Sequence, residues 1–137
     1  MDLLKCKVRL ALLWVIKAIG LSSYLFLGLI KYDTMGNMMK AMGQQDNKVW
    51  PVVMGLMWWI PWVMAWLSMT LKGSANRWSN FIMGIIMGVV LIFDMVTNAD
   101  ISSPAMVIDF IVGLLVIVLI VWYAWKLPKE EVLQASK

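Results

Sequence analysis

Long apolar runs separated by short polar stretches dominate the pattern along the chain. Four runs stand out, at residues 8–30, 49–71, 78–97 and 104–125. Each run is close to the ~20 residues that a helix needs to cross the hydrocarbon core of a bilayer. The pattern predicts an all-α fold, in which a polytopic bundle of four transmembrane helices forms a single domain over residues 1–137.

The charges outside the runs predict an orientation. An even number of spans places both termini, and the polar tail at 127–137, on one side of the membrane. Eight basic residues lie on that side and three on the other: Lys5, Lys7, Arg9, Lys72, Arg77, Lys126, Lys129 and Lys137 against Lys31, Lys40 and Lys48. Because basic residues are enriched in cytoplasmic loops, we predict that both termini are cytoplasmic (N-in/C-in) in a multi-pass protein of a bacterial or archaeal inner membrane.

Composition supports the membrane assignment and excludes several chemistries. The chain is 62% hydrophobic with a mean hydropathy of +0.80, whereas a soluble domain is about 45–50% apolar. It has no histidine and one cysteine, which excludes histidine acid–base chemistry, the usual zinc sites and an intrachain disulfide. The net charge of +4 flanks the apolar runs, so we predict the lipid bilayer as partner and no nucleic acid.

The connection at residues 31–48 is rich in methionine. Met35, Met38, Met39 and Met42 have the spacing i, i+3, i+4 and i+7, which predicts a short helix lying in the outer membrane interface. Clustered thioethers can also hold Cu(I), which is the weaker alternative. We otherwise predict no metal and no cofactor.

Three ionisable residues fall inside the runs: Lys17, Asp94 and Asp109. Each costs about 2.5–3.5 kcal/mol at the centre of a membrane helix, so we expect them to face the bundle interior. The helical rise puts the two aspartates at nearly one depth, with Lys17 roughly 10 Å closer to the cytoplasm. The favoured interpretation is a desolvated ion pair that fixes packing. The alternatives are a proton or ion relay in which the aspartates share a proton, or charges that face a partner subunit.

Small residues share faces with these charges and predict close helix packing. Gly20 and Gly28 lie on the Lys17 face of the first run, and Gly113 lies on the Asp109 face of the last. In the third run the small stripe is Asn80, Gly84 and Gly88. The stripe would serve packing within the bundle or between protomers, so a homodimer or a larger membrane complex is an expected partner.

Aromatic residues form two groups. In the second run, Trp58, Trp62 and Trp66 recur every four residues near Pro61, which is expected to kink the helix. This stripe indicates packing or lipid contact, and the alternative is a pocket for a quinone or a lipid. At the cytoplasmic boundary we expect interface anchors, with Asn76 also capping the third helix: Asn76, Arg77, Trp78, Trp122, Tyr123 and Trp125.

The stretches "IPWVMAWLSMTLKGSANRWSNFIMG" (60–84) and "WYAWK" (122–126) resemble a domain-of-unknown-function family of small four-span bacterial membrane proteins, and more loosely the DoxX-type four-helix proteins. The resemblance implies a four-helix membrane fold. It also implies an acidic residue early in the last span, which corresponds to Asp109. The family resembled has no assigned activity, so the resemblance implies none here.

The sequence offers no residue set for hydrolysis or group transfer, and we predict a non-enzymatic protein. The favoured function is a structural or accessory membrane protein with an interior cluster of Lys17, Asp94 and Asp109. The alternatives are a small proton- or ion-coupled transporter or channel, and a quinone- or lipid-binding membrane redox partner.

Overall fold

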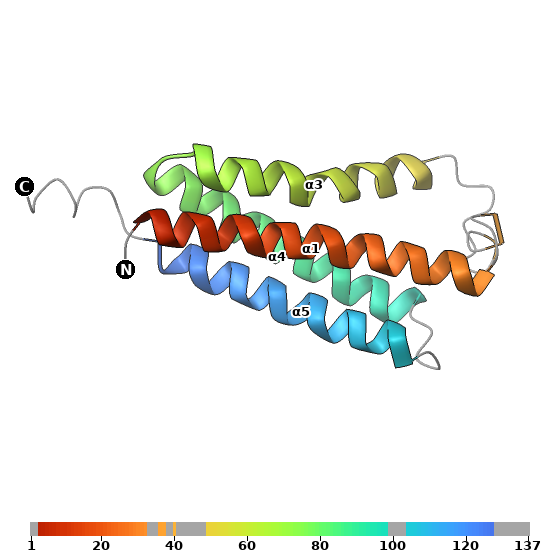
Figure 1. Cartoon of the computed structure of the whole chain (residues 1–137). Helices are drawn as coiled ribbons and strands as arrows, with labels where there is room; N and C mark the ends of the chain where they lie inside the picture. Colours follow the sequence, from red (N-terminus) through yellow and green to blue (C-terminus); the bar gives the residue numbers. More distant parts are fainter. Residues whose placement is uncertain (1–2, 33–35, 38–39, 41–48, 99–103, 128–137) are drawn as a thin grey trace, which may run out of the picture.

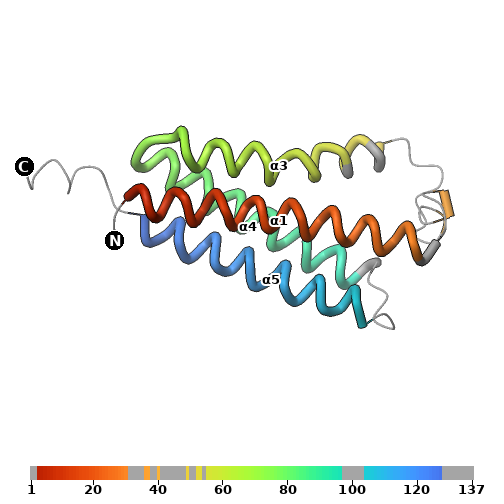
Figure 2. Tube along the Cα trace, viewed as in Figure 1, coloured from red at the N-terminus to blue at the C-terminus, as the bar shows by residue number. Residues whose placement is uncertain are grey.

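Four long helices make up the bundle: α1 (Leu3–Tyr32), α3 (Trp50–Thr70), α4 (Gly73–Asn98) and α5 (Pro104–Trp125) (Figure 1). This computed structural model describes residues 3–32, 36–37, 40, 49–98 and 104–127. The helices run alternately in opposite directions, so α1 begins and α5 ends at the same end of the bundle (Figure 2). The described residues contain no strand, and the predicted all-α four-helix bundle is confirmed.

Two helices reach beyond the predicted membrane crossings. α1 begins at Leu3 and α4 begins at Gly73, so Lys5, Lys7 and Arg77 lie in helical turns rather than in loops. At about 1.5 Å per residue, a helix of this length extends past a hydrocarbon core about 30 Å thick. The extra turns place these basic side chains where they can reach the interface.

The outward faces of the helices are apolar over most of their length. Large side chains such as Trp59, Phe93 and Val96 are more than 60% exposed. Such a surface does not occur on an ordinary soluble monomer. Three segments are long and apolar enough to cross a membrane: Leu3–Ile30, Gly73–Val96 and Pro104–Lys126. The chain is therefore a membrane protein.

α3 is not among these three segments. It is 21 residues long and contains no charged residue, and a helix of about 20 apolar residues is long enough to cross a bilayer. The fourth membrane crossing, predicted at 49–71, stays a prediction. Pro61 lies within α3 and is buried.

The connection between α3 and α4 is a tight turn held by side chains. Gly73 has a positive φ of 46°, which glycine adopts without strain. Asn76 lies inside α4 instead of ahead of it, so it does not cap that helix as predicted. Its side-chain amide donates to the carbonyl oxygens of Ser68 at 2.8 Å and Leu71 at 3.2 Å. Lys7 also donates to the Leu71 carbonyl at 2.7 Å, which ties α1 to the turn.

The helices pack unequally around α1. α1 contacts both α3 and α5 extensively, and α4 packs against α5, whereas α3 and α4 make little contact. These two helices are close at their shared turn and diverge toward the opposite end (Figure 1). The core therefore follows α1, where Leu10 and Trp14 are fully buried, and it includes Met64 of α3, Met87 of α4 and Ile120 of α5.

Small residues account for the close approach of α4 to α5. A Cβ added at Gly84 would lie 2.9 Å from Val121 Cγ2, and one added at Gly88 would lie 3.3 Å from Ile117 Cγ2. These two glycines pack within the bundle. Gly28 is buried. Gly20 differs from the predicted packing role, because no atom lies within 4 Å of its added Cβ and the residue borders open space.

The methionine cluster of Met35, Met38, Met39 and Met42 lies outside the described residues, as does most of the connection at 31–48. The interfacial helix and the weak copper alternative stay predictions. Residues 128–137 of the tail also lie outside the described part.

Candidate functional site

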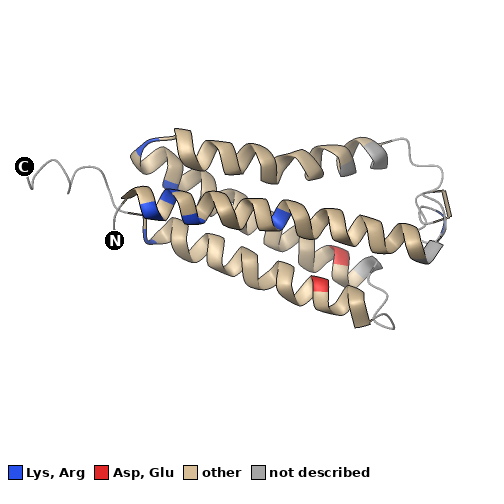
Figure 3. Cartoon of the chain, viewed as in Figure 1, with Lys and Arg blue, Asp and Glu red and all other residues tan. Residues whose placement is uncertain are grey.

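Charges in the bundle are sharply segregated. In the part of the chain that the structure describes, Asp94 and Asp109 are the sole acidic residues, and both lie in the half of the bundle away from the termini (Figure 3). Most basic residues gather at the opposite end, beside the start of α1 and the α3–α4 turn. Lys17 stands apart from these, midway along α1, and is only 6% exposed.

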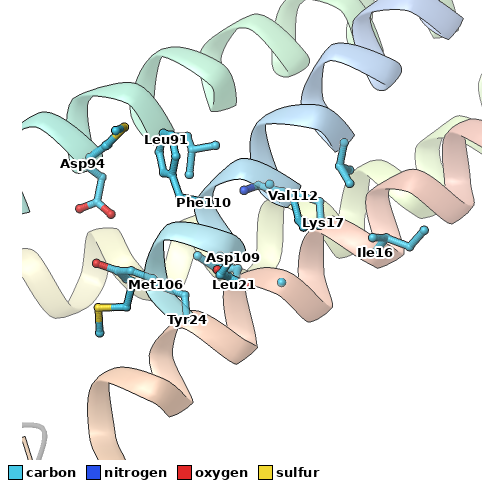
Figure 4. Close-up of a pocket in the computed structure, with 14 residues that line it drawn as sticks. Ile16, Lys17, Leu21, Tyr24, Leu91, Asp94, Met106, Asp109, Phe110 and Val112 are labelled. Carbon is cyan, nitrogen blue, oxygen red and sulfur yellow. The ribbon is translucent and has the colours of Figure 1, made fainter. Parts of the chain in front are cut away.

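Lys17, Asp94 and Asp109 line one cavity between α1, α4 and α5. Figure 4 shows the three side chains entering this space from different helices. The cavity has a volume of about 70 Å³, which leaves room for more than one water molecule. We call these three residues the charge cluster. The geometry brings together the three residues that the sequence analysis singled out.

The three members of the charge cluster face the same cavity from three helices. Within the described residues, no hydrogen bond or ion pair joins Lys17 Nζ to Asp109. Asp94 has a bonded or electrostatic partner of its own. The cavity beside Lys17 is large enough for water. Hydration would lower the free-energy cost of placing an ammonium group inside a membrane.

Gly113 makes the position of Lys17 possible. A Cβ added at Gly113 would lie 3.3 Å from Lys17 Nζ, so any larger residue would crowd the ammonium group. The sequence analysis assigned Gly113 to helix packing from its place on the Asp109 face. The structure places it both against Leu91 of α4, at 3.5 Å from the added Cβ, and against the charged side chain of Lys17. The second contact becomes visible only when α1 and α5 are seen side by side.

A second cavity adjoins the first. It has a volume of about 180 Å³ and lies between α1, α3 and α4, where α3 and α4 diverge. Its polar boundary is shared with the first cavity through Lys17, Tyr24 and Asp94. The remaining wall is apolar and includes Val53 and Met57 of α3. The sequence analysis missed this cavity, because it depends on helices failing to pack.

A neutral hydrogen-bond network fills the half of the bundle near the termini. Trp14 Nε1 donates to Asn80 Oδ1 at 2.6 Å, and Ser68 Oγ donates to the same oxygen at 2.7 Å. Asn80 Nδ2 donates in turn to the backbone oxygen of Asn76 at 2.8 Å. All four side chains are fully buried. The sequence analysis named Asn80 only as a small residue and Asn76 as an anchor and helix cap, and it did not single out Trp14 or Ser68.

The predicted interface anchors meet basic side chains at the end where the termini lie. Arg77 lies 4.6 Å from the ring centre of Trp125, and Lys126 lies 4.2 Å from that of Trp122. Arg9 lies 5.7 Å from the Tyr123 ring centre. Each of these arrangements is a cation–π contact. Trp78 is 52% exposed and packs edge-on against Phe81.

The tryptophan stripe of α3 faces outward. Trp58, Trp62 and Trp66 are each more than 40% exposed, and none of them lines either cavity around Lys17. Trp58 Nε1 donates to Ser22 Oγ at 3.0 Å, which links α3 to α1. This arrangement fits lipid contact better than an enclosed quinone site.

No group of three or more His, Cys, Asp or Glu side chains that could hold a metal ion occurs in the described part of the chain. Comparison with protein-family models, curated proteins and solved structures finds no match to this chain. The resemblance to small four-span membrane proteins therefore stays a prediction, and the candidate function rests on the charge cluster and its cavities.

Proposed function

We propose that this protein is a small proton- or ion-coupled membrane transporter or channel whose ion-binding centre is the charge cluster. The observation that carries the proposal is Lys17, a nearly buried ammonium that opens on a water-sized cavity shared with two carboxylates. Ionisable side chains inside a membrane bundle that line a cavity are typical of proton and ion pathways.

The charge balance of the cluster supports ion binding. One ammonium and two carboxylates leave one unit of negative charge when all three are ionised. That excess is costly in a medium of low dielectric constant. A proton taken up by one carboxylate, or a bound cation, would make the three groups neutral together. The cluster therefore accommodates one exchangeable positive charge.

A purely structural or accessory role is the competing proposal. It draws support from the way Lys17 of α1 lies against Gly113 of α5. Against it stands the neutral network around Asn80, which already joins α1, α3 and α4 through direct bonds. A bundle that is fixed by neutral bonds has less need of a buried charge for specificity.

The two ends of the bundle differ around the cluster. Toward the termini, the fully buried Leu10, Trp14 and Ile120 separate Lys17 from the end where the basic residues lie. Passage of an ion through the bundle thus requires movement or hydration of this packed layer. We propose that the basic end is cytoplasmic and that the protein resides in the inner membrane of a prokaryote, in accord with the distribution of basic residues.

Proton flux in proteoliposomes tests the proposal. Vesicles that contain the protein should dissipate an imposed pH gradient faster than empty vesicles, and Asp109→Asn should reduce this flux to the level of empty vesicles. Lys72→Gln is the matched control, because it removes an exposed charge at the basic end and should leave flux unchanged. Flux in Asp109→Asn equal to that of the unaltered protein would overturn the proposal.

A further inference from the structure

A groove lies between α4 and α5 on the outer surface of the bundle, in the half where the termini lie. Its volume is about 350 Å³. Gly84 and Ile117 line it and are buried, whereas Ile85 and Val118 line it and are 45% and 56% exposed. Because exposed apolar side chains border the groove, it opens toward the acyl chains of a surrounding bilayer.

Aromatic rings and cations meet at one end of this groove. Trp122 and Trp125 of α5 line it and are exposed. The Arg77 guanidinium lies 4.6 Å from the ring centre of Trp125, and Lys126 Nζ lies 4.2 Å from that of Trp122. Both rings therefore carry a cation, one from the start of α4 and one from the residue after α5.

The described charges at this end of the bundle are all positive. In the part of the chain that the structure describes, the acidic residues Asp94 and Asp109 lie in the opposite half of the bundle (Figure 3). No carboxylate of the described residues therefore neutralises Arg77 or Lys126. Charge complementarity favours an anion beside these two cations, and a phosphate group can accept two parallel hydrogen bonds from a guanidinium.

The apolar groove and the two cations together match one class of molecule. An acyl chain is complementary to a groove that opens on lipid, and a phosphate is complementary to cations at the membrane interface. Anionic phospholipids carry both groups, and basic pockets beside membrane helices on the cytoplasmic side bind such head groups. A zwitterionic phospholipid carries an additional cation, which Arg77 and Lys126 would repel.

We propose that the α4–α5 groove binds an anionic phospholipid, with one acyl chain along the groove and the phosphate beside Arg77 and Lys126. The rings of Trp122 and Trp125 hold the two cations at the depth of the lipid head group. This groove and the cavity of the charge cluster have no lining residue in common. Lipid binding here is therefore independent of the proposed ion transport.

Titration of the full chain in a non-ionic detergent tests the proposal, with bound lipid counted by native mass spectrometry. The two probes are phosphatidylglycerol, which is anionic, and phosphatidylcholine with the same acyl chains, which is zwitterionic. We expect a site that prefers phosphatidylglycerol by roughly tenfold or more, equivalent to at least about 1.4 kcal/mol.

Charge variants test the head-group contacts. Arg77→Gln and Lys126→Gln should each weaken phosphatidylglycerol binding by roughly fivefold, equivalent to about 1 kcal/mol, and should change phosphatidylcholine binding little. Lys72→Gln is the matched control, because it removes an exposed charge at the same end and Lys72 does not line the groove. It should bind phosphatidylglycerol as the unaltered protein does.

A pair of neighbouring variants on α4 tests the groove itself. Ile85 lines the groove and Ile86 does not, although both are 45% exposed. Ile85→Trp fills the groove and should weaken phosphatidylglycerol binding by roughly tenfold or more. Ile86→Trp is the matched control and should bind this lipid as the unaltered protein does.

Four outcomes would overturn the proposal. Equal binding of the two lipids would mean that the groove accepts any acyl chain. An equal loss in Lys72→Gln and Arg77→Gln would mean that the lipid responds to the overall surface charge. Unchanged phosphatidylglycerol binding in Ile85→Trp would place the lipid elsewhere. A dimer that Ile85→Trp dissociates, with no lipid bound, would assign the groove to a second copy of the chain.

Discussion

Trp14 Nε1 donates a hydrogen bond to Asn80 Oδ1 at 2.6 Å between two fully buried side chains of α1 and α4. Asn80 Oδ1 also accepts from Ser68 Oγ of α3 at 2.7 Å, so one oxygen joins three helices. α3 and α4 make little other contact. The bundle is thus closed by neutral polar bonds near the termini and is open between α3 and α4 around the charge cluster.

Asn80→Ala should destabilise the bundle. The change leaves the buried Trp14 indole N–H without its acceptor, and an unsatisfied buried donor costs about 1–3 kcal/mol. Double-mutant cycles on hydrogen bonds between membrane helices average about 0.6 kcal/mol, so we expect a loss of about 1–2 kcal/mol. Thermal unfolding in detergent measures it. Thr70→Val removes an exposed hydroxyl that bonds within α3 and should change stability little; an equal loss in both variants would contradict the role of the network.

Gly113→Ala should impair flux more than it impairs folding. The added methyl group would lie 3.3 Å from Lys17 Nζ, so the ammonium must move away from its present place in the cavity. Alanine also favours the helix by up to about 1 kcal/mol over glycine, which offsets part of the crowding. We expect reduced proton flux in proteoliposomes with a melting temperature close to that of the unaltered protein.

Gly55→Ala is the control for Gly113→Ala, because no atom lies within 4 Å of a Cβ added at Gly55. It should retain flux and gain a little stability. Retained flux in Gly113→Ala would show that the position of the Lys17 ammonium is unimportant for ion passage, and it would remove Gly113 from the site.

Neutralising Lys17 and Asp109 separately and together distinguishes a structural role for the cluster from an ion-binding role. A directly bonded buried pair loses about 3–5 kcal/mol when one partner is removed, and it recovers when both are replaced. Because no direct bond joins Lys17 to Asp109 in the described structure and water-sized space surrounds them, we expect smaller losses. Thermal unfolding of Lys17→Met, Asp109→Asn and the double variant measures the coupling.

Two results of that cycle lead to opposite conclusions. Small single-variant losses that add in the double variant agree with a hydrated ion-binding centre. Large losses in both single variants with recovery in the double variant would favour the structural or accessory role. Lys72→Gln removes an exposed charge at the basic end and gives the baseline for charge removal outside the cavity.

The helices and the intramembrane charges could be predicted from the sequence, because apolar runs and isolated ionisable residues can be recognised without knowledge of the fold. The sequence analysis placed Asp94 and Asp109 at nearly one depth and Lys17 roughly 10 Å closer to the cytoplasm, and the structure places all three on one cavity. The sequence did not predict the Trp14–Asn80 hydrogen bond or the second cavity, which lies where α3 and α4 diverge. Both depend on which helices touch and which diverge, and hydropathy carries no information about that choice.

For the same reason, the sequence could not distinguish glycines that pack against a neighbouring helix from glycines that border open space. Gly84 and Gly88 pack against α5, Gly20 borders open space, and Gly113 admits the Lys17 side chain. A small residue on a helix face indicates close approach or open space equally well. The neighbour decides between them, and the neighbour is a property of the fold rather than of the helix.

The orientation of the bundle can be tested at the α3–α4 turn. Ser74 is exposed beside that turn, at the end where the basic residues gather. The native Cys6 is buried, and Cys6→Ser gives a background without other thiols. Because basic residues favour the cytoplasmic side, Ser74→Cys should resist a membrane-impermeant maleimide in intact cells and react with it in inverted vesicles. Labelling of Ser74→Cys in intact cells, with none in inverted vesicles, would place both termini outside and reverse the direction of proton entry to the charge cluster.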